Sequence, residues 1–262
     1  MTLAAAHGVR LEGLPPTPWL SLDGAQDWPA ARIAWEARAG GPLVVDVAAG
    51  RVGVRAGIAP EEVVHPLSTG IGLHFAVARG FDAVHAGAVA GPSGTWAVAG
   101  SKGAGKSTLL AACARQGLAV VSDDALIYDG RRCFAGPRSI DLREAAAERF
   151  GAAVAVRGSA ARRRLTLPPI TGEHRLAGMI HLAWGREPAL RPVSASDSLA
   201  QLLERHREDG FPRNPVGMMD VAALPAYELV RPREWGRLAE TVRLLQRLVA
   251  PMPTRVPSRA AA

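Results

Sequence analysis

One short glycine-rich stretch constrains the fold of this chain more than any other. Residues 100–107, GSKGAGKS, match the pattern G-x-x-x-x-G-K-[ST] at every fixed position. An apolar run at 96–99 precedes the stretch, and a run that favours helix follows it at 108–116. This order predicts a strand, a tight loop and a helix in succession. We therefore expect an α/β domain built around this loop.

The same stretch predicts a site for the phosphates of a nucleotide. Glycines let successive backbone N–H groups point at one anion, and the positive end of the following helix adds attraction. Lys106 can give charge to the outer phosphates, and the Ser107 hydroxyl can bind Mg²⁺. Lys102 could touch phosphate or be an exposed loop lysine, and the alternative for the whole stretch is an ordinary glycine-rich turn. The expected nucleotide-binding residues are Gly100, Ser101, Lys102, Gly103, Ala104, Gly105, Lys106, Ser107 and Thr108.

Two adjacent aspartates and one histidine are candidates for the chemistry at this loop. Asp123 and Asp124 end an apolar run 17 and 18 residues after Lys106. One carboxylate can hold Mg²⁺, and the other can accept the proton of an attacking hydroxyl. Both can act only if the strand breaks near them, because neighbouring strand residues point to opposite faces. Alternatively, one of them caps a turn. His85 could orient a carboxylate and tune its basicity, or could be structural.

The remaining patterns predict strands that alternate with helices in three regions. We expect a β-rich N-terminal annex at 1–65 with a hairpin over 42–57, a catalytic domain at 66–250, and a disordered tail at 251–262. Helices are expected over 66–80, 106–117, 139–151, 196–209 and 234–249. Strands are expected over 83–91, 95–100, 118–124, 175–185 and 224–232, and 161–169 is expected to be a basic connector.

Composition narrows the class of partner. Lysine and arginine number 31 against 24 acidic residues, a net charge of +7 that favours an anionic partner. The longest basic run is only the three arginines at 162–164, so we expect no nucleic acid. The 2 cysteines lack metal-type spacing and are expected to be reduced thiols. No charged leader with an apolar core and no stretch of 18 apolar residues is present, which predicts a soluble cytoplasmic protein without membrane contact.

Residues 85–129 resemble the catalytic core of bacterial HPr kinase/phosphorylase. The resemblance is closer to the shorter HPr-kinase-like proteins encoded in biosynthetic clusters for ribosomal peptides such as lasso peptides. In that family a histidine opens the strand before the loop, and the strand after the loop helix ends in Asp-Asp. His85, the loop and the aspartates at 123–124 stand in that order here, with similar spacing.

The resemblance implies a fold, an activity and a set of roles. The fold is the P-loop kinase core of the HPr kinase C-terminal domain and PEP carboxykinase type, with a mixed β-sheet. The activity is ATP- and Mg²⁺-dependent transfer of the γ-phosphoryl group to a serine hydroxyl, with a ribosomal lasso-type precursor as the favoured acceptor. Asp123, assisted by His85, is preferred as the base, Asp124 and Ser107 are assigned to the metal, and Lys106 is catalytic. Relatives of this kind are often hexamers.

The chain also departs from the full bifunctional enzyme. Residues 133–144, CFAGPRSIDLRE, lack a long glycine- and isoleucine-rich signature, so phosphorylase activity and HPr as the substrate are not expected. Arg138, Arg143 and the arginines at 162–164 could bind the transferred phosphate or an acidic peptide, or be solvated surface residues. Two other functions remain open, namely a small-molecule kinase on the same core and a nucleotide-binding regulator or ATPase without an acceptor.

Overall fold

Three short strands near the N-terminus form a sheet of their own. The computed structural model describes residues 81–250, except 137, 153, 156–161, 171–172 and 210–214, together with these strands. They are β1 (Arg32–Ala37), β2 (Gly41–Asp46) and β3 (Arg51–Val54), and they pair antiparallel in that order. The expected hairpin over 42–57 is confirmed by β2 and β3. The helix expected over 66–80 and the tail at 251–262 lie outside the described residues.

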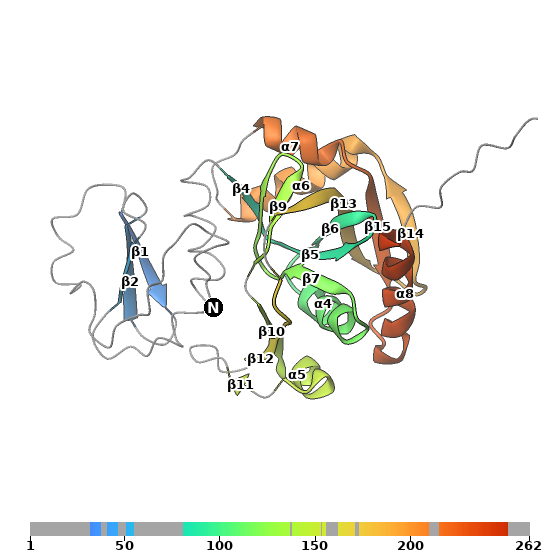
Figure 1. Cartoon of the computed structure of the whole chain (residues 1–262), viewed down its shortest axis with the longest axis horizontal. Coiled ribbons are helices and arrows are strands. Elements are labelled where there is room, and N and C mark those ends of the chain that lie inside the picture. Colours follow the sequence, from blue (N-terminus) through green and yellow to red (C-terminus); the bar gives the residue numbers. More distant parts are fainter. Residues whose placement is uncertain are drawn as a thin grey trace, which may run out of the picture.

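A mixed β-sheet forms the centre of the described structure (Figure 1). Its nine strands are β4 (Asp82–Val84), β5 (Ala86–Gly91), β6 (Gly94–Ala99), β7 (Ala119–Ser122), β8 (Leu126–Asp129), β9 (Arg132–Phe134), β13 (Glu173–Trp184), β14 (Ala189–Val193) and β15 (Ala226–Arg231). The order is β4-β8-β9-β13-β6-β5-β7, and β15 joins β13 and carries β14 at its other side. Strand β13 runs parallel to β6 and to β15, and the other pairs are antiparallel. This sheet confirms the expected mixed α/β fold.

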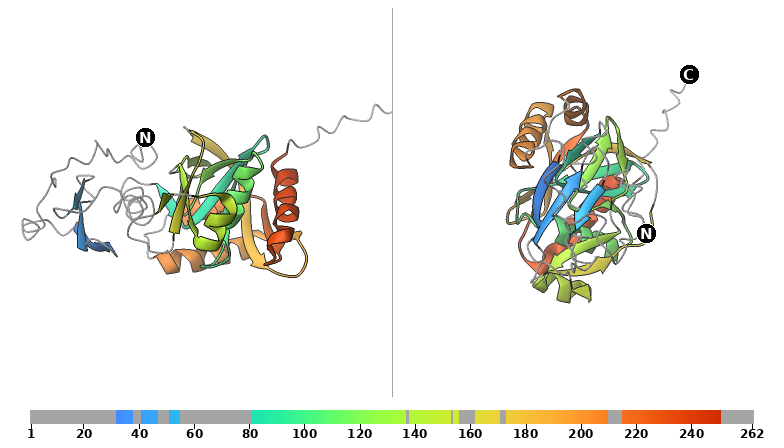
Figure 2. Two further views of the ribbon diagram at one scale, coloured as in Figure 1. Left: turned by 90° about the horizontal axis from the view of Figure 1, so that it is seen from below. Right: turned by 90° about the vertical axis from the view of Figure 1, so that its left-hand side faces the viewer.

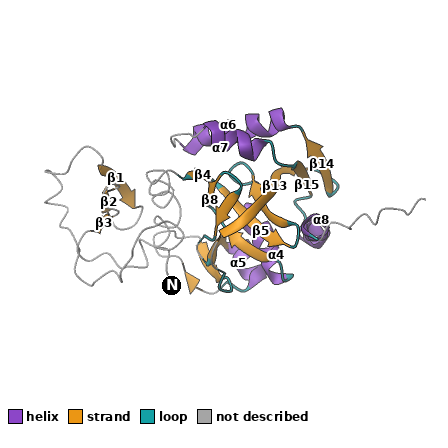
Figure 3. Cartoon of the chain, turned by 45° about the horizontal axis from the view of Figure 1, so that its top comes forward, coloured by secondary structure: helices purple, strands orange, loops and turns teal. Residues whose placement is uncertain are grey.

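Helices cover both faces of the sheet (Figures 1 and 3). One face carries α4 (Lys106–Arg115) and α8 (Leu238–Val249), and the other carries α6 (Ala195–Asp209) and α7 (Pro215–Ala222). Helix α5 (Glu144–Phe150) packs against α4. Strand side chains alternate between two cores, as the two-residue strand period requires. On neighbouring strands, Val98 and Ile180 face the α4 side, whereas Ala97 and Met179 face the α7 side. Helix α8 also packs against α4, β14 and β15 (Figure 2).

A second small sheet corrects two of the sequence-based expectations. It consists of β10 (Ser139–Arg143), β11 (Val154–Ala155) and β12 (Arg162–Thr166), in the order β10-β12-β11. The expectation of a helix from residue 139 is wrong for the first five residues, because Ile140 and Leu142 alternate inward with a strand period. The expected connector is wrong because its arginines form β12. Arg164 donates two hydrogen bonds of 2.7 and 2.8 Å to the Asp141 carboxylate across the pair.

Several other described elements follow the expectations, whereas β8, β9, β14 and α7 were not predicted. Helix α4 starts at the loop lysine and stops before Gly117, whose φ is +82°. Helices α6 and α8 and strands β13 and β15 lie where the patterns predicted, with a short 3₁₀ turn, η3 (Trp235–Arg237), leading into α8. Cys113 and Cys133 are buried free thiols, as expected. Within the part of the chain that the structure describes, no helix is both long enough and apolar enough to cross a membrane.

Candidate active site

The loop between β6 and α4 turns tightly and contacts the side chain of its own lysine. Gly103 and Gly105 have φ of +85° and +78°, values that L side chains rarely adopt. The Lys106 side chain is buried, and its Nζ donates a 2.7 Å hydrogen bond to the Gly100 carbonyl, so the ammonium crosses the loop. Gly105 is the N-cap of α4, and no side chain accepts from the first turn. The loop therefore presents a lysine and helix N–H groups to one small region.

The strand that carries the two aspartates breaks at them. Strand β7 ends at Ser122, and Asp124 has φ of +68°, the one positive value of a non-glycine residue in the described chain. The Ala125 N–H donates to the Asp123 carbonyl at 2.8 Å, and the Ser122 hydroxyl donates to the Ala125 carbonyl. The break required for both carboxyls to reach the loop is therefore confirmed, and the chain resumes as β8.

Asp123 is buried against the first turn of α4. The Ser107 hydroxyl donates a 3.2 Å hydrogen bond to Asp123 Oδ1. Burial raises the pKa of Asp123 from 3.8 to about 8, and the negative charge of Asp124 adds to the rise, while the Ser107 hydrogen bond and the Lys106 charge oppose it. A cation held beside this carboxyl would restore its charged form.

Asp124 takes the opposite direction and pairs with His85. Its Oδ1 lies 3.4 Å from His85 Nδ1, and the two side chains are 26% and 38% exposed. Both residues line the cavity beside the loop, whereas Asp123 is not among its lining residues. A substrate group in the cavity can therefore approach the Asp124–His85 pair directly.

The cavity joins the loop to several other segments of the chain. Its volume is about 280 Å³. Lining residues come from the loop and α4, from the second small sheet, and from the ends of β13 and β15. They are His85, Lys102, Gly103, Gly105, Lys106, Ser107, Thr108, Asp124, Asp141, Leu142, Arg143, Arg162, Trp184, Arg231, Pro232, Arg233, Glu234, Trp235 and Leu238.

The oxygen atoms beside the loop fit Mg²⁺ better than a softer metal. Among the described residues, no cluster of three or more His, Cys, Asp or Glu side chains could enclose a metal. The available donors are instead one hydroxyl and one carboxylate, on Ser107 and Asp123, with their oxygens 3.2 Å apart. Mg²⁺ is commonly held by one or two such protein oxygens while water and phosphate complete its shell. The donor set thus fits a magnesium ion that arrives with a nucleotide.

The two arginines that were proposed to contact phosphate have different surroundings in the structure. Arg138 donates hydrogen bonds to the carbonyls of Pro168, Val121 and Val120 at 2.9, 3.1 and 2.8 Å. It does not line the cavity, so its contacts hold β7 instead of a ligand. Arg143 is exposed and does line the cavity.

Sequence reasoning missed an arginine and a tryptophan beside the loop. Arg231 is buried, its Nη2 donates to the Ala104 carbonyl, and its guanidinium lies 4.1 Å from the centroid of the Trp184 ring. Burial lowers the pKa of Arg231 to about 10. Arg231 lies 127 residues after Ala104 in the chain and belongs to no motif. Its only mark in the sequence is its place at the end of the predicted strand 224–232.

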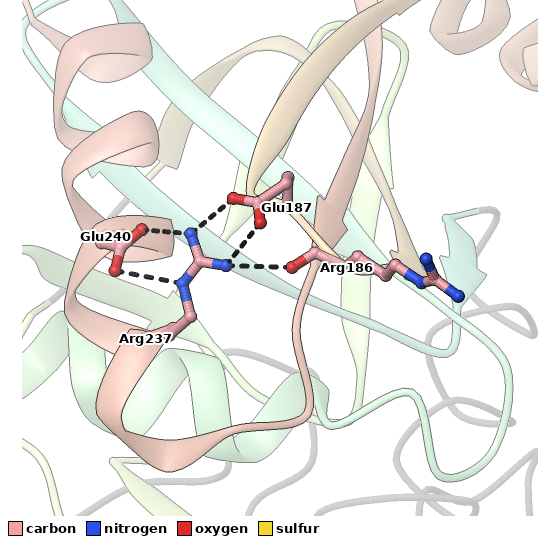
Figure 4. Close-up of polar contacts among 4 residues, drawn as sticks. All are labelled: Arg186, Glu187, Arg237 and Glu240. Carbon is pink, nitrogen blue, oxygen red and sulfur yellow. Dashed lines mark hydrogen bonds and ion pairs between the residues drawn. The ribbon is translucent and has the colours of Figure 1, made fainter.

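An ion-pair network fixes the segment that follows Arg231 (Figure 4). Arg237 pairs with Glu187 at 2.6 Å and with Glu240 at 2.8 Å, and it also donates to the Arg186 carbonyl at 3.0 Å. These contacts join the turn between β13 and β14 to the start of α8. Trp184, at the end of β13, and residues 231–235, before Arg237, both line the cavity. The network therefore connects the two segments that form this side of the cavity.

Comparison with known proteins finds likeness to solved structures only. No protein-family model matches the chain, and no curated protein matches it. Among solved structures, the chain is similar to the Hpr(Ser) kinase/phosphatase from Coxiella burnetii, with 16% identity and a TM-score of 0.33. The match covers 64% of this chain and 97% of the other. A likeness at this level assigns no function, and the geometry of the site carries the argument that follows.

Proposed function

We propose that this chain is an ATP- and Mg²⁺-dependent kinase that phosphorylates a serine hydroxyl of a peptide or protein. One observation carries the proposal: the two carboxyls that follow β7 meet the glycine loop from two directions. Asp123 contacts Ser107, and Asp124 faces the cavity with His85. A loop that binds phosphate, a carboxylate for metal and a second carboxylate for a proton are the parts that phosphoryl transfer requires.

The contacts suggest a role for each residue. Mg-ATP bound here would supply the phosphoryl group and the charge neutralisation that its transfer needs. Lys106 and the N–H groups of the loop would bind the outer phosphates, and Ser107 with Asp123 would hold the metal. His85 would orient Asp124, which accepts the proton of the acceptor hydroxyl.

This assignment reverses the preference drawn from the sequence. From the sequence, Asp123 was expected to accept the proton and Asp124 to bind the metal. The hydrogen bond from Ser107 reaches Asp123, however, and the carboxyl that lines the cavity is Asp124. The raised pKa of Asp123 would suit a base, but a cation bound beside Asp123 would lower that pKa.

The surroundings of Asp124 favour a peptide or protein acceptor. The Asp124–His85 pair is partly exposed, so a serine on an extended chain can reach it without entering a closed cavity. Lys102, Arg143 and Arg162 line the same cavity and would attract acidic residues of the acceptor. A ribosomal lasso-type precursor, which the family resemblance suggests, is the first acceptor to try.

A labelled transfer assay tests the proposal. The full chain is incubated with γ-labelled ATP, Mg²⁺ and precursor peptides encoded by neighbouring genes, and peptide mass is followed. We expect a gain of one phosphate that Asp124→Asn lowers by at least about 100-fold while Mg-ADP still binds. Asp123→Asn should instead weaken Mg-ADP binding. Asp129→Asn, which removes an exposed carboxyl of β8 that pairs with Arg132, is the matched control and should behave as wild type.

Two outcomes would count against the proposal. ATP turnover that labels only water would favour an ATPase or a nucleotide-dependent regulator. If Asp124→Asn phosphorylated the peptide fully and only Asp123→Asn lost this activity, Asp123 would be the base, as the sequence suggested.

A further inference from the structure

Beside the glycine loop lies a buried arginine that has no acidic partner in the part of the chain that the structure describes. Only 3% of Arg231 is exposed. No carboxylate among the described residues forms an ion pair with it, and its Nε has no hydrogen-bond partner. Its guanidinium donates a hydrogen bond to the Ala104 carbonyl and lies over the face of the Trp184 ring. A buried charge without a counter-charge is costly to the fold, so Arg231 is poorly explained as a stabilising residue.

The position of this guanidinium relates it to the ligand site. A Cβ added to Gly105 would lie 1.9 Å from Arg231 Nη2, so the guanidinium is packed directly on the loop at the residue before Lys106. Arg231 also lines the cavity that Lys106 and Ser107 line. The unpaired charge therefore stands next to the place where an anion is expected.

We propose that Arg231 is a phosphate-binding residue, whose guanidinium supplies a second fixed positive charge beside Lys106 and takes its counter-charge from the phosphate held on the loop. This inference rests on the proposed function and adds a named residue to its binding site. The Trp184 ring and the Ala104 carbonyl hold the guanidinium in place before the ligand arrives. Because little ordering is then needed on binding, the charge acts with small entropic cost.

Two simpler roles lead to different expectations. As a structural clamp on the Ala104 carbonyl, Arg231 would stabilise the unliganded protein. As a platform for the nucleobase, Arg231 would matter for ADP but not for pyrophosphate, which has phosphates and no base. A phosphate-binding residue should affect both ligands equally and should be dispensable for the unliganded fold.

Binding of ADP and of pyrophosphate to the full chain, measured by calorimetry with Mg²⁺ present, separates these roles. Arg231→Gln keeps an N–H donor but removes the charge, and Arg231→Lys keeps the charge. We expect the Gln variant to bind both ligands at least about tenfold more weakly, by a common factor, and the Lys variant to lose less. Arg191→Gln is the matched control, because Arg191 is an exposed arginine on β14 that pairs with Glu228. It should bind both ligands as wild type does.

Thermal unfolding without ligand gives the second readout. Arg231→Gln should unfold at the same temperature as wild type or higher, because the mutation removes an uncompensated buried charge. Arg231→Met, which fills the same space with an apolar chain, is a second neutral variant in case the amide is poorly tolerated. If both neutral variants unfold at a lower temperature or fail to fold, Arg231 is structural and the proposal is overturned.

The binding results can overturn the inference in three further ways. Unchanged affinities in the neutral variants would show that Arg231 does not contact phosphate. A loss confined to ADP would place the guanidinium against the nucleoside. If wild type itself binds neither ligand, the inference and the proposed kinase function both fail, whereas the first two results leave the proposed function intact.

Discussion

The hydroxyl of Ser107 donates a hydrogen bond of 3.2 Å to Oδ1 of Asp123. This contact links the first turn of α4 to the end of β7 and places two oxygen ligands side by side. It also distinguishes the two aspartates, because Asp124 turns away toward His85. The proposed division of labour between metal binding and proton transfer follows from this one contact.

Replacing Ser107 by alanine should therefore weaken Mg²⁺ dependence specifically. We expect Ser107→Ala to lower the affinity for Mg-ADP by about 10- to 100-fold, since one metal ligand is lost, and to change metal-free ADP binding little. Ser107→Thr keeps the hydroxyl and should stay near wild type. The measurement is ADP binding across a Mg²⁺ titration. Equal losses with and without Mg²⁺ would mean that Ser107 contacts the nucleotide and not the metal.

The raised pKa of Asp123 predicts how stability changes with pH. The unfolded chain ionises Asp123 above about pH 4, whereas the folded, ligand-free protein keeps the proton until about pH 8. The folded state therefore binds more protons in this window, and Asp123 lowers the free energy of unfolding progressively as pH rises from 4 to 8. Asp123→Asn should remove this penalty, gaining on wild type by about 1 kcal/mol or more between pH 5 and pH 8.

Urea denaturation of both proteins at pH 5, 6.5 and 8 measures this difference. The Asn side chain can still accept the Ser107 hydrogen bond, so the comparison isolates the charge. Parallel pH profiles for the two proteins would show that Asp123 is ionised in the ligand-free fold.

Alanine substitutions at two glycines of the loop should lower the free energy of unfolding by different amounts. At Gly103 a Cβ has no atom within 4 Å, so Gly103→Ala should cost only backbone strain of about 1–2 kcal/mol. At Gly105 the Cβ would also collide with Arg231 Nη2, at 1.9 Å. We expect Gly105→Ala to lose clearly more unfolding free energy in urea and to abolish ADP-induced stabilisation. Equal losses in the two variants would mean that Arg231 can move aside freely.

The sequence was most informative where chemistry and local structure coincide. The loop pattern predicted the tight loop together with the strand before it and the helix after it, because its glycines and its lysine are all needed for one loop conformation. The two aspartates were recognised by their chemistry and by their place at the end of a predicted strand. Their proposed joint role also predicted the strand break, which the structure has at Asp124. Their individual directions were not predictable, because side-chain direction at an irregular φ of +68° has no sequence pattern.

The rest of the site depends on contacts between distant segments. Arg231 approaches the loop only because β15 pairs with β13, and β13 with β6, so its role depends on sheet order. The alanine-rich run after β10 favours helix, and the alternation around Ile140 spans only five residues, so the sequence pattern predicts helix where the structure has a strand. Arg138 was proposed for phosphate because arginine suits anions, yet backbone carbonyls accept hydrogen bonds from its guanidinium.

Arginines 138 and 143 offer a final pair of variants with opposite expected effects. Arg138→Met leaves the carbonyls of Val120 and Pro168 without their charged donor, so the free energy of unfolding should fall by about 1–3 kcal/mol. Arg143 is exposed on the cavity, so Arg143→Met should change that free energy by less than about 0.5 kcal/mol. In the transfer assay, Arg143→Met should raise KM for an acidic peptide and leave kcat unchanged. If Arg138→Met instead kept the free energy of unfolding of wild type and lost ADP affinity, Arg138 would bind phosphate and its hydrogen bonds to the carbonyls would not stabilise the fold.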